Sequence, residues 1–168
     1  MALLEVMGRV PDGDVLIYAD AGCTVSSSDK AREEFGKWVS LVTCKSPHRL
    51  AFRTHHAESV WCKADTSAVL KSLGPPVLHD VYQFCGGIVV MMNNSENRSF
   101  VSEWLDLMVR DEYHLVTDAP SRLPESKDFS QHRHDQAIFS GLCKVRNAIV
   151  LESVGSHSPI ILSRKRHG

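Results

Sequence analysis

The sequence predicts a single α/β domain, because apolar runs with the length of buried strands alternate with segments whose apolar residues recur at helical spacing. Two such runs stand out, at residues 14–19 and 84–92. The clearest helical spacing lies between Ala31 and Val42. The chain has 168 residues, of which 43% are hydrophobic, and this is enough to bury one core. We therefore expect one domain over residues 1–168.

The first predicted strand follows a Pro-Asp-Gly turn at residues 11–13 and contains four consecutive apolar residues, Val15 to Tyr18. A run without alternation is typical of an interior strand buried on both faces, as in parallel sheets. One of the serines at 26–28 can cap the helix that follows. The apolar residues of that helix share one face: Ala31, Phe35, Trp38, Val39 and Val42.

The next segments continue the alternation of helix and strand. Residues 45–58 are more polar, and we expect an irregular or short-stranded connection there. A second helix is predicted over residues 65–73, because a Gly-Pro-Pro sequence at 74–76 is a strong stop signal. The apolar run at residues 84–92 should be another interior strand. Ser95 can then cap a third helix.

The last part of the chain begins with a stretch rich in Pro, Ser, Asp and Lys. Residues 117–131 are predicted to be a long surface loop, of the kind that often carries function. A helix over residues 135–144 and a strand over residues 148–151 complete the pattern. The basic tail at residues 164–167 should be a solvated end.

Composition argues against several classes of function. The 19 Lys and Arg residues against 20 Asp and Glu residues give a formal net charge of -1, which argues against a general nucleic-acid binder. The five cysteines include no CxxC pair and are expected to be reduced thiols. No apolar run approaches the roughly 20 residues of a membrane helix, and no signal peptide is visible. We expect a soluble, cytoplasmic chain, although an anchor on a preceding segment would not be visible here.

Asp20 is the sharpest candidate for a functional residue. It stands where the first predicted strand ends, and ligands of open α/β sheets bind beyond the carboxyl ends of strands. Its carboxylate is therefore placed to hold a divalent cation. A structural role, in which Asp20 caps the turn formed with Ala21 and Gly22, explains the same residue equally well.

The segment from His132 to Gln136 is the second candidate, because its five adjacent side chains can coordinate a metal or exchange protons. It lies at the start of a predicted helix. An imidazole or carboxylate from this segment can be the second protein ligand of Mn²⁺ or Mg²⁺, whose other positions are diphosphate oxygens and water. Two alternatives stay open. One is a solvated helix start capped by Asp135, and the other is a zinc hydrolase, which needs three protein ligands.

Gly86 and Gly87 are the third candidate, since they precede the second apolar run directly after Gln83, Phe84 and Cys85. Paired glycines at this position let a ligand or another backbone approach closely. A bulge that relieves packing is the alternative. The pattern around them is neither GxGxxG nor GxxxxGK, so it is no phosphate-binding loop.

Taken in order, these segments resemble a family of glycosyltransferase-like proteins found in viruses, bacteria and algae. The family's blocks read approximately GD, an apolar run and DAGC; W-x-K-x-D; QF-x-GG and an apolar run; F-x-x-x-W-L; and HRHDQ-x-x-FS. In this chain they lie at residues 13–23, 61–65, 83–92, 100–105 and 132–140. The match extends from Gly13 to about Lys144, and five ordered blocks are far more specific than any one of them.

The resemblance implies a GT-A-like fold, with three layers in which helices flank a mixed sheet. Asp20 then occupies the position of the DxD metal-binding motif, but Gly22 stands where the second Asp is usual. The metal site should therefore use His132, His134 or Asp135 as a further protein ligand. GT-A domains ordinarily have a longer nucleotide-binding segment before this motif, so the N-terminal strands are expected to be missing from this chain.

The reaction implied is transfer of a sugar from a nucleoside diphosphate to the hydroxyl of a glycan or another acceptor. Mn²⁺ or Mg²⁺ would neutralise charge on the leaving diphosphate. The expected metal ligands are Asp20 with His132 or His134. If the anomeric centre inverts, a carboxylate takes the acceptor's proton, with Asp135 the first choice and Asp80 the second.

Further residues of the blocks are expected to contact the substrate. Lys63 or Arg53 would add positive charge near the phosphates. The remaining candidates for substrate binding are Gln83, Gly86, Gly87 and Gln136. Two other functions stay open: a truncated, catalytically silent binding module, and a metal-dependent hydrolase built around the HRHD sequence.

Overall fold

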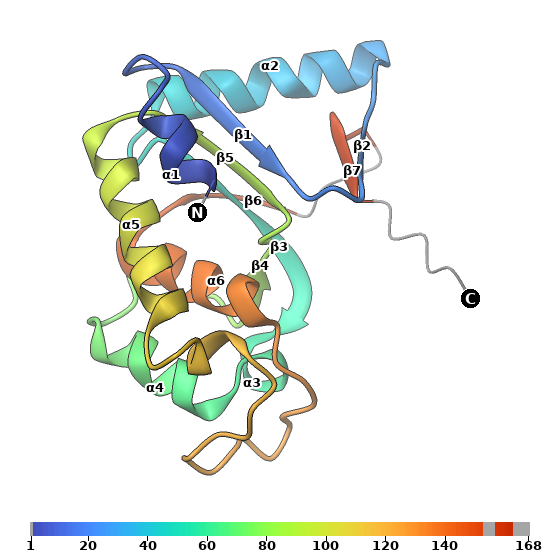
Figure 1. The fold of residues 1–168 in the computed structure, drawn as a ribbon. Helices are drawn as coiled ribbons and strands as arrows, with labels where there is room; N and C mark the ends of the chain where they lie inside the picture. The colour runs from blue at the N-terminus through green and yellow to red at the C-terminus, as the bar shows by residue number, and fades with distance from the viewer. Residues whose placement is uncertain (1, 153–156, 163–168) are drawn as a thin grey trace.

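The structure is a computed structural model that describes residues 2–152 and 157–162. It shows a mixed sheet flanked by helices (Figure 1), so the predicted α/β class is confirmed. The elements in chain order are α1 (Ala2–Met7), β1 (Val15–Ala19), β2 (Cys23–Val25), α2 (Asp29–Cys44), β3 (Arg49–Ala57), α3 (Glu58–Trp61), α4 (Ala64–Ser72), β4 (Tyr82–Phe84), β5 (Ile88–Met92), α5 (Ser95–Val109), the 3-10 helix η1 (His114–Val116), α6 (His134–Arg146), β6 (Ile149–Leu151) and β7 (Ile160–Leu162).

The five-stranded sheet is organised around β3. The start of β3 pairs with β5 on one side, antiparallel, and with β6 on the other side, parallel, so that Leu50 lies opposite both Val90 and Ile149. The second half of β3 pairs antiparallel with β4. β1 joins the other side of β5, antiparallel, with Ala19 opposite Ile88. A separate ribbon pairs β2 with β7 near the tip of β1 (Figure 1).

Helices cover both faces of the sheet because successive side chains of β3 and β5 point to opposite sides. On one face, Ile88 and Val90 pack with Trp38 and Val42 of α2. On the other face, Val89 and Met91 belong to a second cluster, to which α1, α4, α5 and α6 contribute. The arrangement gives layers of helix, sheet and helix. No helix in the described parts of the chain is both long enough and apolar enough to span a membrane.

Local signals place most helices where the sequence predicts them. Ser28 caps α2, with its hydroxyl accepting a hydrogen bond from the Ala31 amide at 3.2 Å. Asn94, rather than Ser95, caps α5, because its side chain accepts from the Asn97 amide at 2.7 Å. The predicted helices over 65–73 and 135–144 correspond to α4 and α6, and the predicted strand over 148–151 corresponds to β6.

The predicted buried face of α2 is only partly confirmed. Ala31, Trp38 and Val42 are buried, Val39 is half-buried, and Phe35 is 42% exposed. Phe35 belongs to the N-terminal half of α2, which extends past the main sheet toward the β2–β7 ribbon (Figure 1).

The predicted irregular or short-stranded connection over residues 45–58 is wrong, since the segment contains β3, a nine-residue strand at the centre of the sheet. This strand is difficult to recognise in the sequence because it begins with a charged residue, Arg49. Its side chain is 2% exposed, donates to the Asn147 carbonyl at 2.8 Å and to Asn97 Oδ1 at 2.7 Å, and lies 4.5 Å over the Phe100 ring. A buried cation whose hydrogen bonds are all supplied by distant segments leaves no local apolar signal.

The two apolar runs both form strands, but only the second contains an interior strand. β1 is an edge strand with one antiparallel partner among the described residues, and Tyr18 is 40% exposed, so it is no interior strand of a parallel sheet. The run at 84–92 contains β5, which is an interior strand as predicted, but its first residue, Phe84, belongs to β4, and Cys85, Gly86 and Gly87 separate the two strands. The helix α1 and the strands β2 and β7 were not predicted from the sequence. The basic tail at 164–167 lies outside the described residues.

Two helical glycines should respond in opposite ways to substitution by alanine. A Cβ at Gly141 of α6 would collide with the Leu70 side chain of α4, whereas a Cβ at Gly36 of α2 would meet nothing within 4 Å. We expect Gly141→Ala to lower the free energy of unfolding by about 1–3 kcal/mol. Gly36→Ala should raise it by about 0.5–1 kcal/mol. Urea unfolding of both variants tests the packing of α6 on α4, which is in error if Gly141→Ala is neutral.

Candidate functional site

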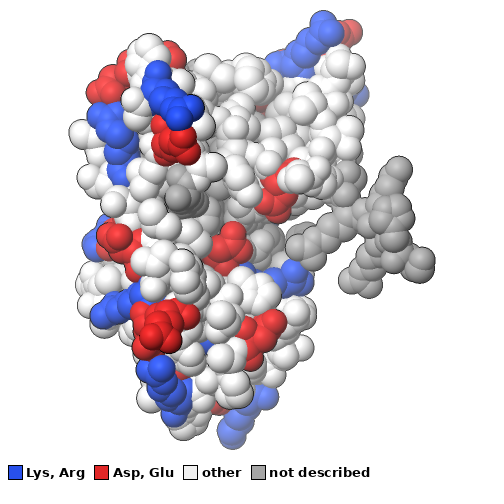
Figure 2. All heavy atoms as spheres, in the orientation of Figure 1, with Lys and Arg blue, Asp and Glu red and all other residues white. Residues whose placement is uncertain are grey.

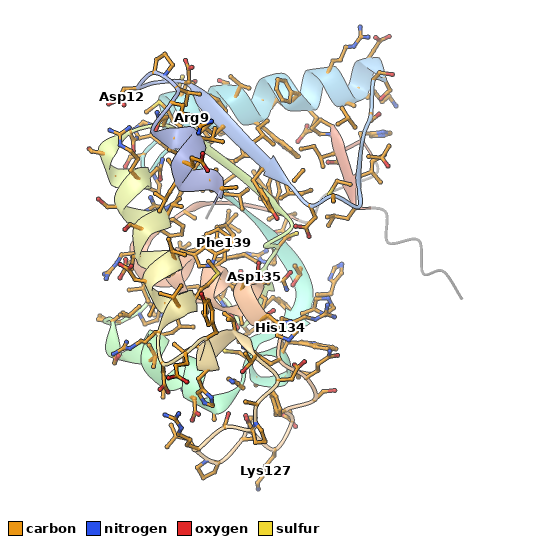
Figure 3. The ribbon with its side chains drawn as sticks, in the orientation of Figure 1. Arg9, Asp12, Lys127, His134, Asp135 and Phe139 are labelled. Carbon is orange, nitrogen blue, oxygen red and sulfur yellow. The ribbon has the colours of Figure 1, made fainter. Side chains whose placement is uncertain are left out.

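A cleft of about 190 Å³ lies between the tip of β1 and the start of α6. Asp20 follows β1, while His134 and Asp135 are the first two residues of α6 (Figure 3). The other lining residues are Gly86, Gly87, Gln131, His132, Arg133 and Gln136. Acidic and basic side chains are interspersed over the face of the molecule seen in Figure 2. The structure thus brings Asp20 and the HRHD segment to one cleft.

The Asp20 carboxylate is held in place while staying exposed to the cleft. Its backbone amide donates to the Gly87 carbonyl at 3.0 Å, and its carbonyl accepts from the Cys23 amide at 2.8 Å. The Tyr18 hydroxyl donates to Asp20 Oδ1 at 2.8 Å. This hydrogen bond, together with partial burial and the carboxylate charge, raises the pKa of Tyr18 to about 12. Tyr18 therefore remains a donor that fixes the carboxylate.

The paired glycines make room for the two walls of the cleft. A Cβ at Gly87 would lie 2.7 Å from Asp20 Oδ2, and a Cβ at Gly86 would lie 3.0 Å from the Gln136 Cα. Any side chain here would displace the Asp20 carboxylate or the start of α6. Of the two interpretations from sequence, close approach of another part of the chain is what the structure shows.

His134 projects into the cleft from a strained backbone position. Its φ of 45° lies in the left-handed region, which costs energy for a residue with a Cβ. The preceding amide, of Arg133, donates to the Trp61 carbonyl at 3.0 Å. His134 Nε2 lies 2.8 Å from Asp118 Oδ1. A carboxylate that holds one imidazole nitrogen directs the other nitrogen, a common arrangement around metal-binding histidines.

The sequence argument did not single out Asp118. It belongs to the loop at 117–131, whose composition indicates function without saying which residue carries it. The structure shows that the loop places the Asp118 carboxylate within hydrogen-bonding distance of His134.

The pKa of the Asp135 carboxyl group is raised above its usual value. Loss of water around the group raises its pKa, and the like charge of Asp20 raises it further, against the hydrogen bond from the Gln136 amide at 3.0 Å. The side chain still reaches solvent through the cleft. Two carboxylates that repel one another across a small space are relieved when a cation or a proton comes between them.

His132 is unsuited to the role of metal ligand that the sequence suggested. It is 3% exposed, and both ring nitrogens are engaged: Nδ1 accepts from the Lys63 amide at 3.3 Å, and Nε2 donates to the Leu115 carbonyl at 2.8 Å. Burial lowers the pKa of His132 to about 4, which keeps the ring neutral, as these two bonds require. His132 holds the loop to the domain and has no nitrogen left for an ion.

Lys63 does not point toward the cleft either. Its ammonium donates to the carbonyls of His114, Thr117 and Ala119, the last two at 3.1 and 3.2 Å. These three bonds use every donor of the ammonium group. Lys63 is 2% exposed, and this burial lowers its pKa. The expectation that Lys63 adds charge near phosphates is therefore wrong in this structure.

Asp65 anchors the same loop from the other side. Its carboxylate accepts from the amides of Arg122 and Leu123, at 2.8 and 3.0 Å, and lies 2.7 Å from His114 Nε2. Burial alone raises the pKa of Asp65, but these hydrogen bonds outweigh it and hold the pKa below its usual range. Together with Trp61 and Lys63, Asp65 makes the W-x-K-x-D block an anchor for the loop.

Arg53 and Asp80 lie away from the cleft and pair with each other. Arg53 Nε donates to Asp80 Oδ2 at 2.6 Å, and the Arg53 guanidinium also contacts Glu152. Asp80 lines a separate groove of about 810 Å³ beside α4 and the C-terminal half of α6. Burial raises the pKa of Asp80, but the Tyr82 amide and Arg53 lower it by more. The structure thus separates both residues from Asp20 and argues against Asp80 as the base.

Gln83 and Gln136 connect the cleft to a buried polar network. Gln136 Nε2 donates to Gln83 Oε1 at 2.9 Å, and Gln136 Oε1 accepts from the Gly86 amide at 3.4 Å. Gln83 is fully buried and donates to Glu58 at 3.1 Å, so it supports the cleft wall from behind. Of this pair, only Gln136 lines the cleft.

Comparisons with known proteins add nothing to this geometry. No family model, curated protein or solved structure matches the chain. The resemblance to glycosyltransferase-like proteins therefore rests on the five sequence blocks alone.

Replacing Asp65 should destabilise the loop in a pH-dependent way. In Asp65→Asn, the amide group must face backbone donors, and we expect a loss of about 1–3 kcal/mol in the free energy of unfolding at pH 7. Because the folded pKa of Asp65 is lowered, its stabilising effect is present above about pH 4, the unfolded value, and is lost as the pH falls further. The difference from wild type should therefore shrink in acid.

Urea unfolding at a series of pH values measures this effect, with Asp128→Asn, in the same loop but exposed, as the control. A difference that stays constant down to the lowest pH would show that Asp65 does not act through its charge.

Proposed function

We propose that the chain is a metal-dependent glycosyltransferase domain that transfers a sugar from a nucleoside diphosphate to an acceptor hydroxyl. One observation carries the proposal: Asp20 at the end of a strand and His134 at the start of α6 line the same small cleft, over a glycine that leaves room for the carboxylate. The helix-flanked mixed sheet and the five sequence blocks support a GT-A-like domain.

The donor set of the cleft fits Mn²⁺ or Mg²⁺ bound together with a diphosphate. A carboxylate oxygen of Asp20 and an imidazole nitrogen of His134 suit hard divalent cations, Mn²⁺ in particular. Within residues 2–152 and 157–162, no group of three or more His, Cys, Asp or Glu residues is arranged to hold a metal ion. The chain would therefore supply one or two ligands and the substrate's phosphates the others, as is usual for nucleotide-bound Mg²⁺.

Each cleft residue has a part in this proposal. Tyr18 fixes the Asp20 carboxylate, and Asp118 fixes the His134 imidazole, so both candidate ligands are oriented before any substrate binds. When bound, the cation would neutralise charge on the departing diphosphate. Asp135 borders the same cleft, and we propose it as the base that takes the acceptor's proton if the anomeric centre inverts.

The other two functions are less well supported by the geometry. A zinc hydrolase built around the HRHD sequence loses one of its histidines, because both nitrogens of His132 are engaged within the protein. A catalytically silent module requires no carboxylate and imidazole side chains that line the same cleft. The strained backbone of His134 and the hydrogen-bonded carboxylate of Asp20 are features that fit a working site better.

Binding of the metal should depend on the nucleotide and on Asp20. We expect Mn²⁺ alone to bind weakly and to bind at least tenfold more tightly in the presence of a nucleoside diphosphate sugar. Asp20→Ala should abolish this enhancement, since it removes a ligand without touching the core. Isothermal titration with a panel of nucleotide sugars measures both effects.

Asp14→Ala is the matched control, because Asp14 is exposed at the opposite end of the same strand. Absence of metal-dependent nucleotide binding in the wild type would favour the silent module. Enhancement that persists in Asp20→Ala would mean that the ion sits elsewhere.

Gly87→Ala should weaken the same binding without removing a ligand. The new Cβ would lie 2.7 Å from Asp20 Oδ2, and the carboxylate would have to move. Displacing a metal ligand or its support typically costs about 10–100-fold in affinity. Isothermal titration with the best nucleotide sugar should show a loss in this range, while circular dichroism confirms that the variant folds. Unchanged affinity would contradict the placement of the ion beside Gly87.

A further inference from the structure

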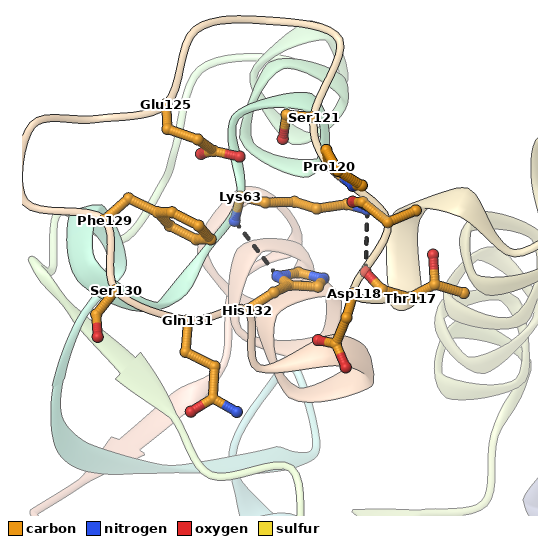
Figure 4. A pocket seen from close by; sticks show the side chains of 11 residues that line it. Lys63, Thr117, Asp118, Pro120, Ser121, Glu125, Phe129, Ser130, Gln131 and His132 are labelled. Carbon is orange, nitrogen blue, oxygen red and sulfur yellow. Dashed lines mark hydrogen bonds between the residues drawn. The ribbon is translucent and has the colours of Figure 1, made fainter.

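We infer that a second cavity, beside the cleft, is the subsite that holds the acceptor as a single sugar ring. This loop pocket has a volume of about 200 Å³ and lies between the loop at 117–131 and the start of α4 (Figure 4). Its lining includes Lys63, Asp118, Ser121, Glu125, Phe129 and His132. The assignment as an acceptor subsite rests on the proposed transferase function.

The loop pocket adjoins the cleft where the donor would bind. Gln131 and His132 line both cavities. Asp118 lines the loop pocket, and its carboxylate lies 2.8 Å from Nε2 of His134, which lines the cleft. A ligand in the loop pocket would therefore lie next to the candidate cation site, as an acceptor must.

The chemistry of the walls matches a carbohydrate, which has apolar C–H faces and a rim of hydroxyls. In Figure 4, the Phe129 ring points toward Lys63 and His132, and Pro120 lies on the far side. The carboxylates of Asp118 and Glu125 can accept hydrogen bonds from ligand hydroxyls. Glu125 already accepts from the Ala64 amide at 2.9 Å through Oε2, which fixes its orientation.

Ser121 supplies an independent indication that a polar ligand binds. Its Oγ is buried, lines the loop pocket and has no hydrogen-bond partner among the described residues. A buried hydroxyl without a partner costs free energy, and such groups in folded proteins usually have a missing partner such as a ligand or a water. A ligand hydroxyl in the loop pocket would satisfy it.

Size and rigidity limit the ligand to one ring. Sites for drug-sized molecules occupy about 300–1,000 Å³, so a cavity of about 200 Å³ accommodates a monosaccharide rather than an oligosaccharide. The loop that forms it is anchored by Lys63, which donates to the loop carbonyls of Thr117 and Ala119 and to the His114 carbonyl just before the loop. Asp65 accepts from two amides of the same loop. Because the wall is formed before binding, little free energy is spent on ordering it.

Saturation-transfer NMR with the methyl glycosides of glucose, galactose, mannose, fucose and N-acetylglucosamine tests the inference. At least one should bind the wild-type protein, and Phe129→Ala should weaken that binding about tenfold, because it removes the apolar wall. Leu123→Ala is the matched control, since Leu123 belongs to the same loop and does not line the loop pocket.

Ser121→Ala separates binding from folding. It should weaken glycoside binding while leaving the stability of the free protein unchanged or raised, because it removes a hydroxyl that has no partner. A variant that lost binding only by unfolding would show the opposite change in stability.

The two proposals can fail separately. If no glycoside binds, or if binding survives in Phe129→Ala, the loop pocket is not a sugar site, whatever the titrations of Asp20→Ala show. If a glycoside binds and Phe129→Ala weakens it, but no metal-dependent nucleotide binding exists, the acceptor role is overturned and a simple carbohydrate-binding site remains.

Discussion

The close approach of the start of α6 to the corner between β4 and β5 is the constraint on which the cleft depends. It requires that residues 86 and 87 have no Cβ, because one Cβ would press on the backbone of Gln136 and the other on the carboxylate of Asp20. The backbone amide of Asp20 is also tied to the Gly87 carbonyl. The end of β1, the corner between β4 and β5 and the start of α6 are therefore fixed relative to one another. Their arrangement determines where the exposed functional groups lie.

Polar residues that look like ligands in the sequence serve here to hold a long loop. Lys63 and Asp65 bond to backbone groups of the loop, and His132 ties its end to the domain. These buried groups are satisfied by main-chain partners, so each carries out a structural task that an apolar side chain could not. The loop is thereby fixed firmly enough to present Asp118 to His134 and to enclose a cavity of its own.

Much of the fold follows from local signals in the sequence, such as the Ser28 cap, the apolar spacing of α5 and the two apolar runs. The central strand does not, because Arg49 receives its partners from segments about 50 and 100 residues away. The resemblance predicted that Asp20 and the HRHD segment would lie together, and the structure places Asp20 and His134 at one cleft. The sequence could not show which side chains already have hydrogen-bond partners within the protein. His132 and Lys63 donate to main-chain carbonyls, and a pattern of side chains contains no information about such bonds.

The β2–β7 ribbon has a consequence for the order in which the molecule assembles. Cys23, three residues after Asp20, pairs with Leu162, which is distant in sequence, so the turn that carries Asp20 is held on one side by the main sheet and on the other by a much later segment. Contacts this distant in sequence form late, because a long loop must close before they gain anything. During synthesis, the cleft would reach its final shape only after residues 160–162 had emerged, and disrupting their pairing with β2 would leave the Asp20 turn supported on one side alone.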